Sequence, residues 1–144
     1  MNQAFDQSAA WLANHLAGEW RSRRRLVDHR ARSRYTFKGG ATITADRFVE
    51  RGYVSTEGRS FQGSREYRLE PSHGLVRVFF PDGRLFVDVR AVVSQTLMHQ
   101  CGDDLYRGRV IFIDHDRWIE QWRVLGPNKR YSSLTRFERV RLSG

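Results

Sequence analysis

The sequence is poor in cysteine, lysine and long apolar runs, and each shortage excludes a class of protein. Cys101 is the single cysteine, so an internal disulfide is excluded, and one thiol is typical of a reducing cytoplasm. No apolar run approaches the roughly 18 residues that cross a bilayer as a helix. The N-terminal segment has no basic stretch followed by a continuous apolar one, so we expect no signal peptide. We therefore predict a cytoplasmic protein.

Positive charge is abundant by contrast. The 144 residues carry a formal net charge of +9, and all of the 25 basic residues except Lys38 and Lys129 are arginines. The densest run, residues 21–34, could neutralise the phosphates of a nucleic acid. Acidic residues interrupt most clusters, however, and no stacking motif or recognition helix accompanies them. Solvent-exposed arginine is the favoured interpretation, and nucleic acid is an unlikely partner.

The hydrophobic period changes after the first 17 residues. Apolar residues at three- and four-residue steps, Leu12 and Leu16 among them, predict a helix over residues 3–17 that Gly18 can end. From residue 18 to residue 142, about ten short segments have a period of two and are separated by turn signals such as Pro81-Asp82-Gly83. The connections are too short for the crossovers that parallel strands need.

These patterns predict an all-β fold, an up-and-down antiparallel β-barrel of about eight to ten strands with one short N-terminal helix. A meander of this many strands tends to close because closure removes its exposed edges. The sequence has no linker, repeat or low-complexity tract. We therefore expect residues 1–144 to form a single domain, with the helix at 3–17 and the barrel at 18–142.

Several polar and aromatic residues share strand faces with large apolar ones, which places them inside the predicted barrel. An unpaired polar group in a packed core costs on the order of 1–3 kcal/mol. These residues therefore either bond to one another or line a cavity that receives a ligand. They are Arg65, Tyr67, His99, Cys101, Tyr106 and Trp122.

Other interpretations of the segment 97–108 compete with a pocket wall. A metal site would need more ligands than His99, Cys101 and Asp104, and no second cysteine is present. A catalytic pair of His99 and Cys101 is disfavoured because side chains two residues apart on a strand stand roughly 6–7 Å apart. A haem on His99 lacks a second signal. We predict no metal and no cofactor, and leave open an enzyme with His99 as general acid or base and Tyr106 or Asp104 as its partner.

The chain also resembles known proteins. Gly18-Glu19-Trp20, after a short helix, is similar to the Gly-x-Trp of lipocalins and fatty-acid-binding proteins, the calycins. Most of the chain resembles an uncharacterised bacterial family of calycin-like domains, through the pieces GEWRSRR, FQGSREY, FFPDGRLF, HQCGDDLYRG and WIEQWRVLGPNKRY and the ending Thr135-x-x-x-Arg139. The resemblance implies a lipocalin-like barrel in which Trp20 fills the floor and an arginine of the last strand packs across it, Arg136 or, by preference, Arg139. Val87 and Arg130 stand where that family often has histidine and aspartate, and the resemblance supplies no function.

A small, partly apolar or anionic ligand inside the barrel is the function we expect. Arg65 and Arg84 would meet negative charge, and Trp122 would provide apolar contact. The full set expected to contact the ligand is Arg65, Tyr67, Arg84, His99, Cys101, Asp104, Tyr106, Trp122, Lys129 and Tyr131. The alternatives are an enzyme using His99 and nucleic-acid binding through residues 21–34. We expect no membrane partner, and a homodimer stays open.

Overall fold

The computed structural model describes residues 3–141, with side chains from residue 7 onward. Within those residues it contains one N-terminal helix and ten strands. The helix begins as α1 (Gln3–Trp11) and ends in a wider π-helical turn, η1 (Leu12–Leu16). The strands are β1 (Gly18–Asp28), β2 (Ser33–Ile43), β3 (Arg47–Thr56), β4 (Arg59–Ser72), β5 (Leu75–Phe79), β6 (Leu85–Arg90), β7 (Ser94–Cys101), β8 (Asp104–Asp114), β9 (Arg117–Leu125) and β10 (Arg130–Arg139).

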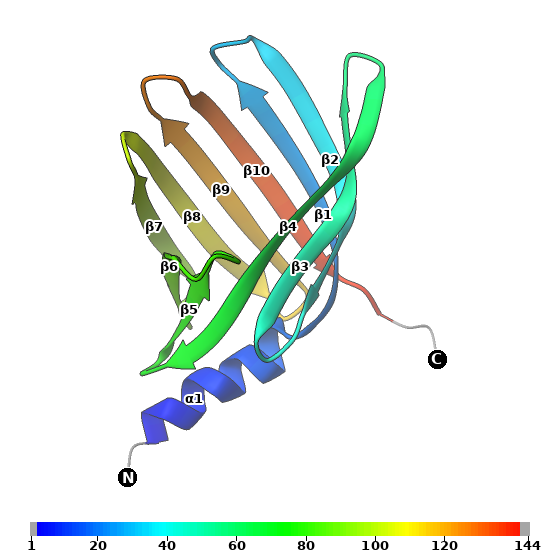
Figure 1. The fold of residues 1–144 in the computed structure, drawn as a ribbon. Coiled ribbons are helices and arrows are strands. Elements are labelled where there is room, and N and C mark those ends of the chain that lie inside the picture. The colour runs from blue at the N-terminus through cyan, green and yellow to red at the C-terminus, as the bar shows by residue number, and fades with distance from the viewer. Residues whose placement is uncertain (1–2, 142–144) are drawn as a thin grey trace.

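The strands form one antiparallel sheet that is nearly closed into a barrel (Figure 1). Their order is β6-β5-β4-β3-β2-β1-β10-β9-β8-β7, so the first and last strands pair in the middle of the sheet. Short turns join most successive strands, which is the connection that antiparallel pairing allows. The predicted all-β, up-and-down barrel with a short N-terminal helix is confirmed.

The two ends of the sheet, β6 and β7, meet at a seam. Although they are consecutive in the chain, they form no strand ladder within the described residues. The side-chain amide of Gln95 accepts a hydrogen bond from the Arg90 backbone N–H (2.8 Å) and donates one to the Arg90 carbonyl (2.7 Å). A side chain thus replaces one pair of ladder bonds at the seam.

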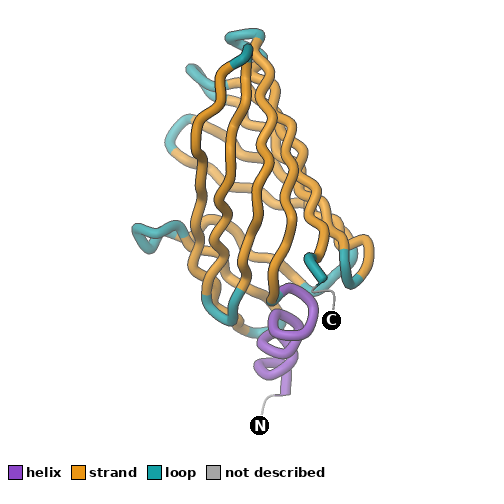
Figure 2. Tube along the Cα trace, turned by 90° about the vertical axis from the view of Figure 1, so that its right-hand side faces the viewer, coloured by secondary structure: helices purple, strands orange, loops and turns teal. Residues whose placement is uncertain are grey.

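The helix lies at one end of the barrel, here called the helix end, and the opposite end is called the far end (Figures 1 and 2). At the helix end, Trp20 is buried and donates through Nε1 to the carbonyl of Leu16 (2.8 Å). The Arg139 guanidinium lies 4.2 Å from the Trp20 ring centre and donates to the carbonyls of Ala17 (2.9 Å) and His15 (2.7 Å). The two residues predicted to close the barrel are therefore in contact. Residue 142, the predicted limit of the barrel, lies outside the described residues.

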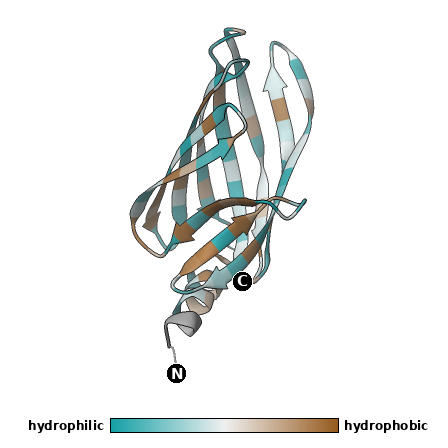
Figure 3. Ribbon diagram, turned by 60° about the vertical axis from the view of Figure 1, so that its left-hand side comes forward, coloured by the Kyte–Doolittle hydropathy of each residue, from teal (hydrophilic) through white to brown (hydrophobic). Residues whose placement is uncertain are grey.

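Side chains alternate between interior and solvent along the strands. On β9, the side chains of Trp118, Glu120 and Trp122 are buried. Gln121, between the last two, and Arg123, after Trp122, are exposed. Hydrophobic residues gather toward the helix end, around β5 and β6 (Figure 3). The apolar core therefore fills the helix end, and polar residues occupy the middle of the barrel.

Candidate functional site

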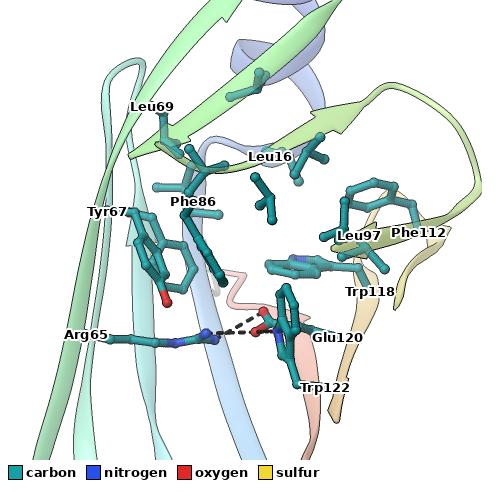
Figure 4. A pocket seen from close by; sticks show the side chains of 17 residues that line it. Leu16, Arg65, Tyr67, Leu69, Phe86, Leu97, Phe112, Trp118, Glu120 and Trp122 are labelled. Carbon is teal, nitrogen blue, oxygen red and sulfur yellow. Dashed lines mark hydrogen bonds and ion pairs between the residues drawn. The ribbon is translucent and has the colours of Figure 1, made fainter. Parts of the chain in front are cut away.

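Four charged side chains cross the middle of the barrel and are here called the charged layer: Arg24 on β1, Glu50 on β3, Arg65 on β4 and Glu120 on β9. Arg24 Nη2 and Arg65 Nε both donate to Glu50 Oε1, at 2.5 and 2.7 Å. Arg65 also donates to both oxygens of Glu120, at 2.7 and 3.2 Å (Figure 4). One guanidinium thereby joins two carboxylates from different strands.

The charged layer is buried and balanced in charge. Glu50 and Glu120 are 1% and 8% exposed, and burying a charge is costly unless it is paired. Burial lowers the pKa of Arg65, but the carboxylates of Glu120 and Glu50 outweigh it and raise that pKa well above its usual value. Burial raises the pKa of Glu120, but Arg65 outweighs it and brings the pKa below its usual value. Arg65 and Glu120 therefore keep their charges at neutral pH.

An aromatic stack lies against the charged layer (Figure 4). Phe86 of β6 stacks on Tyr67 and on Trp122, with ring centres 5.4 and 5.2 Å apart. Trp122 Nε1 in turn donates to Glu120 Oε1 (2.8 Å). The stack and the charged layer together form a partition across the barrel, because Arg65, Tyr67, Phe86, Glu120 and Trp122 line cavities on both of its sides.

Between the partition and the helix lies an apolar cavity of about 90 Å³. Its wall includes Leu16, Leu69, Leu97 and Phe112. Pockets that hold drug-sized ligands typically measure roughly 300–1,000 Å³. The helix end is therefore mostly packed, and this cavity by itself is too small for such a ligand.

On the other side of the partition is a pocket of about 220 Å³, here called the far pocket. Strands β1, β4, β6, β8, β9 and β10 all contribute to its wall, so it lies within the barrel. It is lined by Arg24, Leu26, Arg65, Tyr67, Phe86, Tyr106, Glu120, Trp122, Val124, Tyr131 and Ser133. Apolar and aromatic walls with a few placed polar groups are typical of small-molecule sites.

Three tyrosines from three strands line the far pocket: Tyr67, Tyr106 and Tyr131. Burial raises the pKa of Tyr131, and its hydrogen-bonded neighbour Tyr106 raises it further. Burial also raises the pKa of Tyr67, although Arg65 acts in the opposite direction. Lys129 Nζ lies 3.4 Å from the Tyr106 hydroxyl and 3.6 Å from the Asp104 carboxylate. Tyr67 and Tyr131 therefore stay protonated at neutral pH.

The far pocket brings together half of the ten residues expected to contact a ligand: Arg65, Tyr67, Tyr106, Trp122 and Tyr131. Asp104 and Lys129 lie beside it, next to Tyr106. Arg65, which we expected to meet the negative charge of a ligand, already holds two carboxylates of the chain.

The other three expected residues, Arg84, His99 and Cys101, line neither cavity. Arg84 is exposed and pairs with Asp82 at 2.8 Å. The His99 ring packs against Phe86 and Tyr106, with ring centres 5.2 and 5.8 Å apart. Its Nε2 is buried without a hydrogen-bond partner among the described residues. The Asp104 carboxylate lies 3.6 Å from Lys129 Nζ, and no hydrogen bond or ion pair joins it to His99 within the described residues.

Sequence reasoning misses Arg24, Glu50, Glu120 and Phe86. Alternation was enough to find the first three, because Arg24 shares a strand face with Trp20, Glu50 with Phe48, and Glu120 with Trp118 and Trp122. Phe86 is different, since a β-bulge shifts the register of β5 and β6 and both Phe86 and Val87 line the apolar cavity. Period-two alternation does not reveal where a bulge lies.

The described part of the chain contains no group of three His, Cys, Asp or Glu side chains gathered as a metal site requires. No helix in that part is long and apolar enough to cross a membrane. The thiol of Cys101 is free and partly exposed.

Comparisons with known proteins identify a family and a fold. A model of the family described as "Family of unknown function (DUF6314)" matches residues 16–139. None of the curated proteins matches the chain.

A protein of unknown function from the DUF3598 family of Nostoc punctiforme superposes with a TM-score of 0.59 at 17% identity, over 88% of this chain and 48% of that one. The S-type phycobiliprotein lyase CPES from Guillardia theta superposes with a TM-score of 0.55 at 13% identity, over 90% of each chain. The chain thus spans about half the length of the Nostoc protein, and identities this low show a shared fold alone.

Proposed function

The chain belongs to the DUF6314 family of unknown function, and we propose from its own residues that it binds a small molecule in the far pocket. The observation that carries the proposal is the set of three tyrosines, Tyr67, Tyr106 and Tyr131, in one pocket walled by Phe86 and Trp122. Fold does not decide function, so the proposal rests on this site. The single thiol, Cys101, suits a cytoplasmic binding protein.

The electrostatics of the far pocket support an uncharged ligand. Arg24 and Arg65 are already paired with Glu50 and Glu120, so an anionic ligand would have to displace a carboxylate of the chain. Tyr131, whose pKa is raised by burial and by Tyr106, offers a neutral hydroxyl instead. This narrows the expectation of a partly apolar or anionic ligand to a partly apolar, neutral one.

The size and walls of the far pocket support a flat ligand of one or two rings. Its volume of about 220 Å³ lies below the roughly 300–1,000 Å³ of drug-sized sites. Phe86 stacks on both Tyr67 and Trp122, so a ligand ring would meet this stack at its edges, in the edge-to-face arrangement that aromatic pairs favour. A fused bicyclic phenol has this shape and one neutral polar group.

The test compares two probes of similar size, neutral 1-naphthol and anionic 1-naphthoate, by isothermal titration calorimetry at neutral pH. We expect 1-naphthol to bind more tightly. Tyr131→Phe should weaken its binding about 2- to 12-fold, the equivalent of one hydrogen bond of about 0.5–1.5 kcal/mol. Tyr53→Phe is the matched control, because Tyr53 is 57% exposed and lines no part of the far pocket.

Two results would contradict the proposal. One is the absence of 1-naphthol binding at millimolar concentration together with a ligand-free mass for the freshly purified protein in native mass spectrometry. The other is an equal loss of affinity in the variants of Tyr131 and Tyr53. Tighter binding of 1-naphthoate would overturn the assignment of a neutral ligand.

A further inference from the structure

The register of the sheet gathers basic side chains on one outer face of the barrel. Residues opposite each other on neighbouring strands point to the same side of a sheet. In one such row, Arg136 of β10, Arg23 of β1 and Lys38 of β2 lie side by side. These three side chains are exposed to solvent.

The next two rows toward the far end continue this face across β8, β9, β10, β1 and β2 (Figure 1). The second row contains Arg109 and Arg25, and the third contains Arg107, Arg123 and Arg34, all of them exposed. We call the eight basic residues of the three rows the basic array. No acidic residue occupies an outward position in these rows.

The basic array has no ionic partner within the part of the chain that the structure describes. None of its members forms an ion pair there, and Arg109 alone has a side-chain hydrogen bond, to Ser94 Oγ (3.2 Å). Arg23 lies directly opposite both Arg136 and Lys38. Like charges in that position are destabilising, by up to about 1 kcal/mol for each pair.

The basic array also accounts for almost the whole net charge of the chain. Removing its eight members from the 25 basic residues leaves 17, against 16 acidic ones. The acidic residues that interrupt basic runs in the sequence point elsewhere, as Glu50 and Glu120 do into the barrel. The charge of +9 is therefore a property of one face.

We propose that the basic array binds the phosphate backbone of a nucleic acid without regard to base sequence. Five strands spaced about 4.8 Å apart give a surface about 19 Å wide, enough for several phosphates. All but Lys38 are arginines, whose planar guanidinium bonds phosphate in bidentate fashion. A shallow hollow of about 680 Å³ between Arg25, Arg107 and Arg123 could hold part of a nucleic-acid strand. The described residues of the array all lie on strands of the barrel wall, so the array has no recognition helix that could read bases in a groove.

An anionic lipid surface is the other polyanion that this face could meet, and the array fits it less well. Peripheral membrane binding combines basic residues with exposed aromatic or apolar side chains that enter the headgroup region. Within these five strands the apolar residues of the three rows, Val27, Ile111, Ile119 and Leu134, are all partly buried. Exposed apolar or aromatic side chains continue the rows only at the two edges, as Met98 on β7 and Tyr53 on β3. The face also follows the curved wall of the barrel, which a flexible strand can follow better than a planar bilayer.

The experiment measures the fluorescence anisotropy of a labelled single-stranded oligonucleotide of about 20 nucleotides between about 50 and 200 mM salt. The double variant Arg23→Gln/Arg123→Gln should bind at least about 10-fold more weakly at the lower salt concentration. The logarithm of the association constant falls linearly with the logarithm of the salt concentration, and the magnitude of this negative slope should decrease by about 1.4 in the variant. That is about 0.7 for each of the two phosphates that are no longer neutralised. The control Arg59→Gln/Arg90→Gln removes the same charge from exposed positions on β4 and β6 and should stay within about twofold of the wild type.

Three outcomes would overturn the proposal. Equal weakening by the two double variants would show that net charge alone matters. No binding of the oligonucleotide even at about 20 mM salt would exclude the site. Binding to vesicles of phosphatidylserine and phosphatidylcholine but not to the oligonucleotide would assign the face to a membrane.

Because the basic array lies outside the far pocket, 1-naphthol affinity should be unchanged in both double variants, which separates this test from that of the proposed function.

Discussion

Arg65 connects strands that are distant from each other around the barrel. On one side it lies directly opposite Glu50 in the β3–β4 ladder, and on the other it reaches across the interior to Glu120 of β9. Three of its N–H groups are occupied by these two carboxylates. Removing one partner from such a buried pair costs about 3–5 kcal/mol, because it leaves a buried charge less compensated.

Glu120→Gln tests this role of the charged layer. We expect the free energy of unfolding at neutral pH to fall by about 3 kcal/mol, measured by urea denaturation. The control is Glu66→Gln, because Glu66 forms a surface ion pair with Arg47 and is 40% exposed. A surface pair contributes about 0–1 kcal/mol, so the control should lose no more than that. Equal losses in the two variants would contradict a special role for Glu120.

The same variant should change how stability depends on pH. The pKa of Glu120 is lower in the folded protein than its ordinary value of 4.5. Its contribution is therefore fully present above the unfolded pKa and is lost as the pH falls through the folded pKa. Between about pH 5 and pH 3 the wild type should lose stability more steeply than Glu120→Gln. Parallel curves of unfolding free energy against pH would contradict the assignment.

Strand β6 is the element that the sheet holds least firmly. It pairs with β5 alone, through a bulged register, and Gln95 links its end to β7. It also carries Phe86, one of the five residues that line both the apolar cavity and the far pocket. A displacement of β6 would therefore move part of the partition between the two cavities.

Gln95→Ala tests the seam. The substitution removes two hydrogen bonds to Arg90, and we expect a loss of about 1–3 kcal/mol with faster hydrogen exchange at the amides of β6. Amides of β1, which pairs on both sides, should keep their protection. Gln62→Ala is the matched control, because Gln62 is exposed on β4. Unchanged exchange in β6 would show that Gln95 does not hold the seam.

At the scale of the whole molecule, the sequence predicts what depends on chain order and alternation, and little else. In a meander the chain order decides which strands are neighbours, so the ten-stranded barrel and the inward positions of Arg65 and Trp122 follow from the pattern. The contact of Arg65 with Glu120 does not follow, because it depends on how the barrel closes across its interior. Charge sorting is hidden for the same reason. Residues 21–34 supply three members of the basic array, Lys38 follows on β2, and the fold brings the other four from β8, β9 and β10.

The sorting of charge gives a last prediction, about stability rather than binding. Arg23 faces two like charges across the sheet, so Arg23→Gln should raise the thermal midpoint at low ionic strength by about 2–4 °C. Salt screens the same repulsion, so the difference from the wild type should shrink as salt rises from about 10 to 150 mM. Arg59→Gln, which removes an exposed charge outside the basic array, should change the midpoint by less than about 1 °C. Differential scanning calorimetry of the three proteins decides the matter. A lower midpoint for Arg23→Gln would mean that Arg23 stabilises the barrel by packing. The like charges of the basic array would then cause no net repulsion for a bound polyanion to relieve.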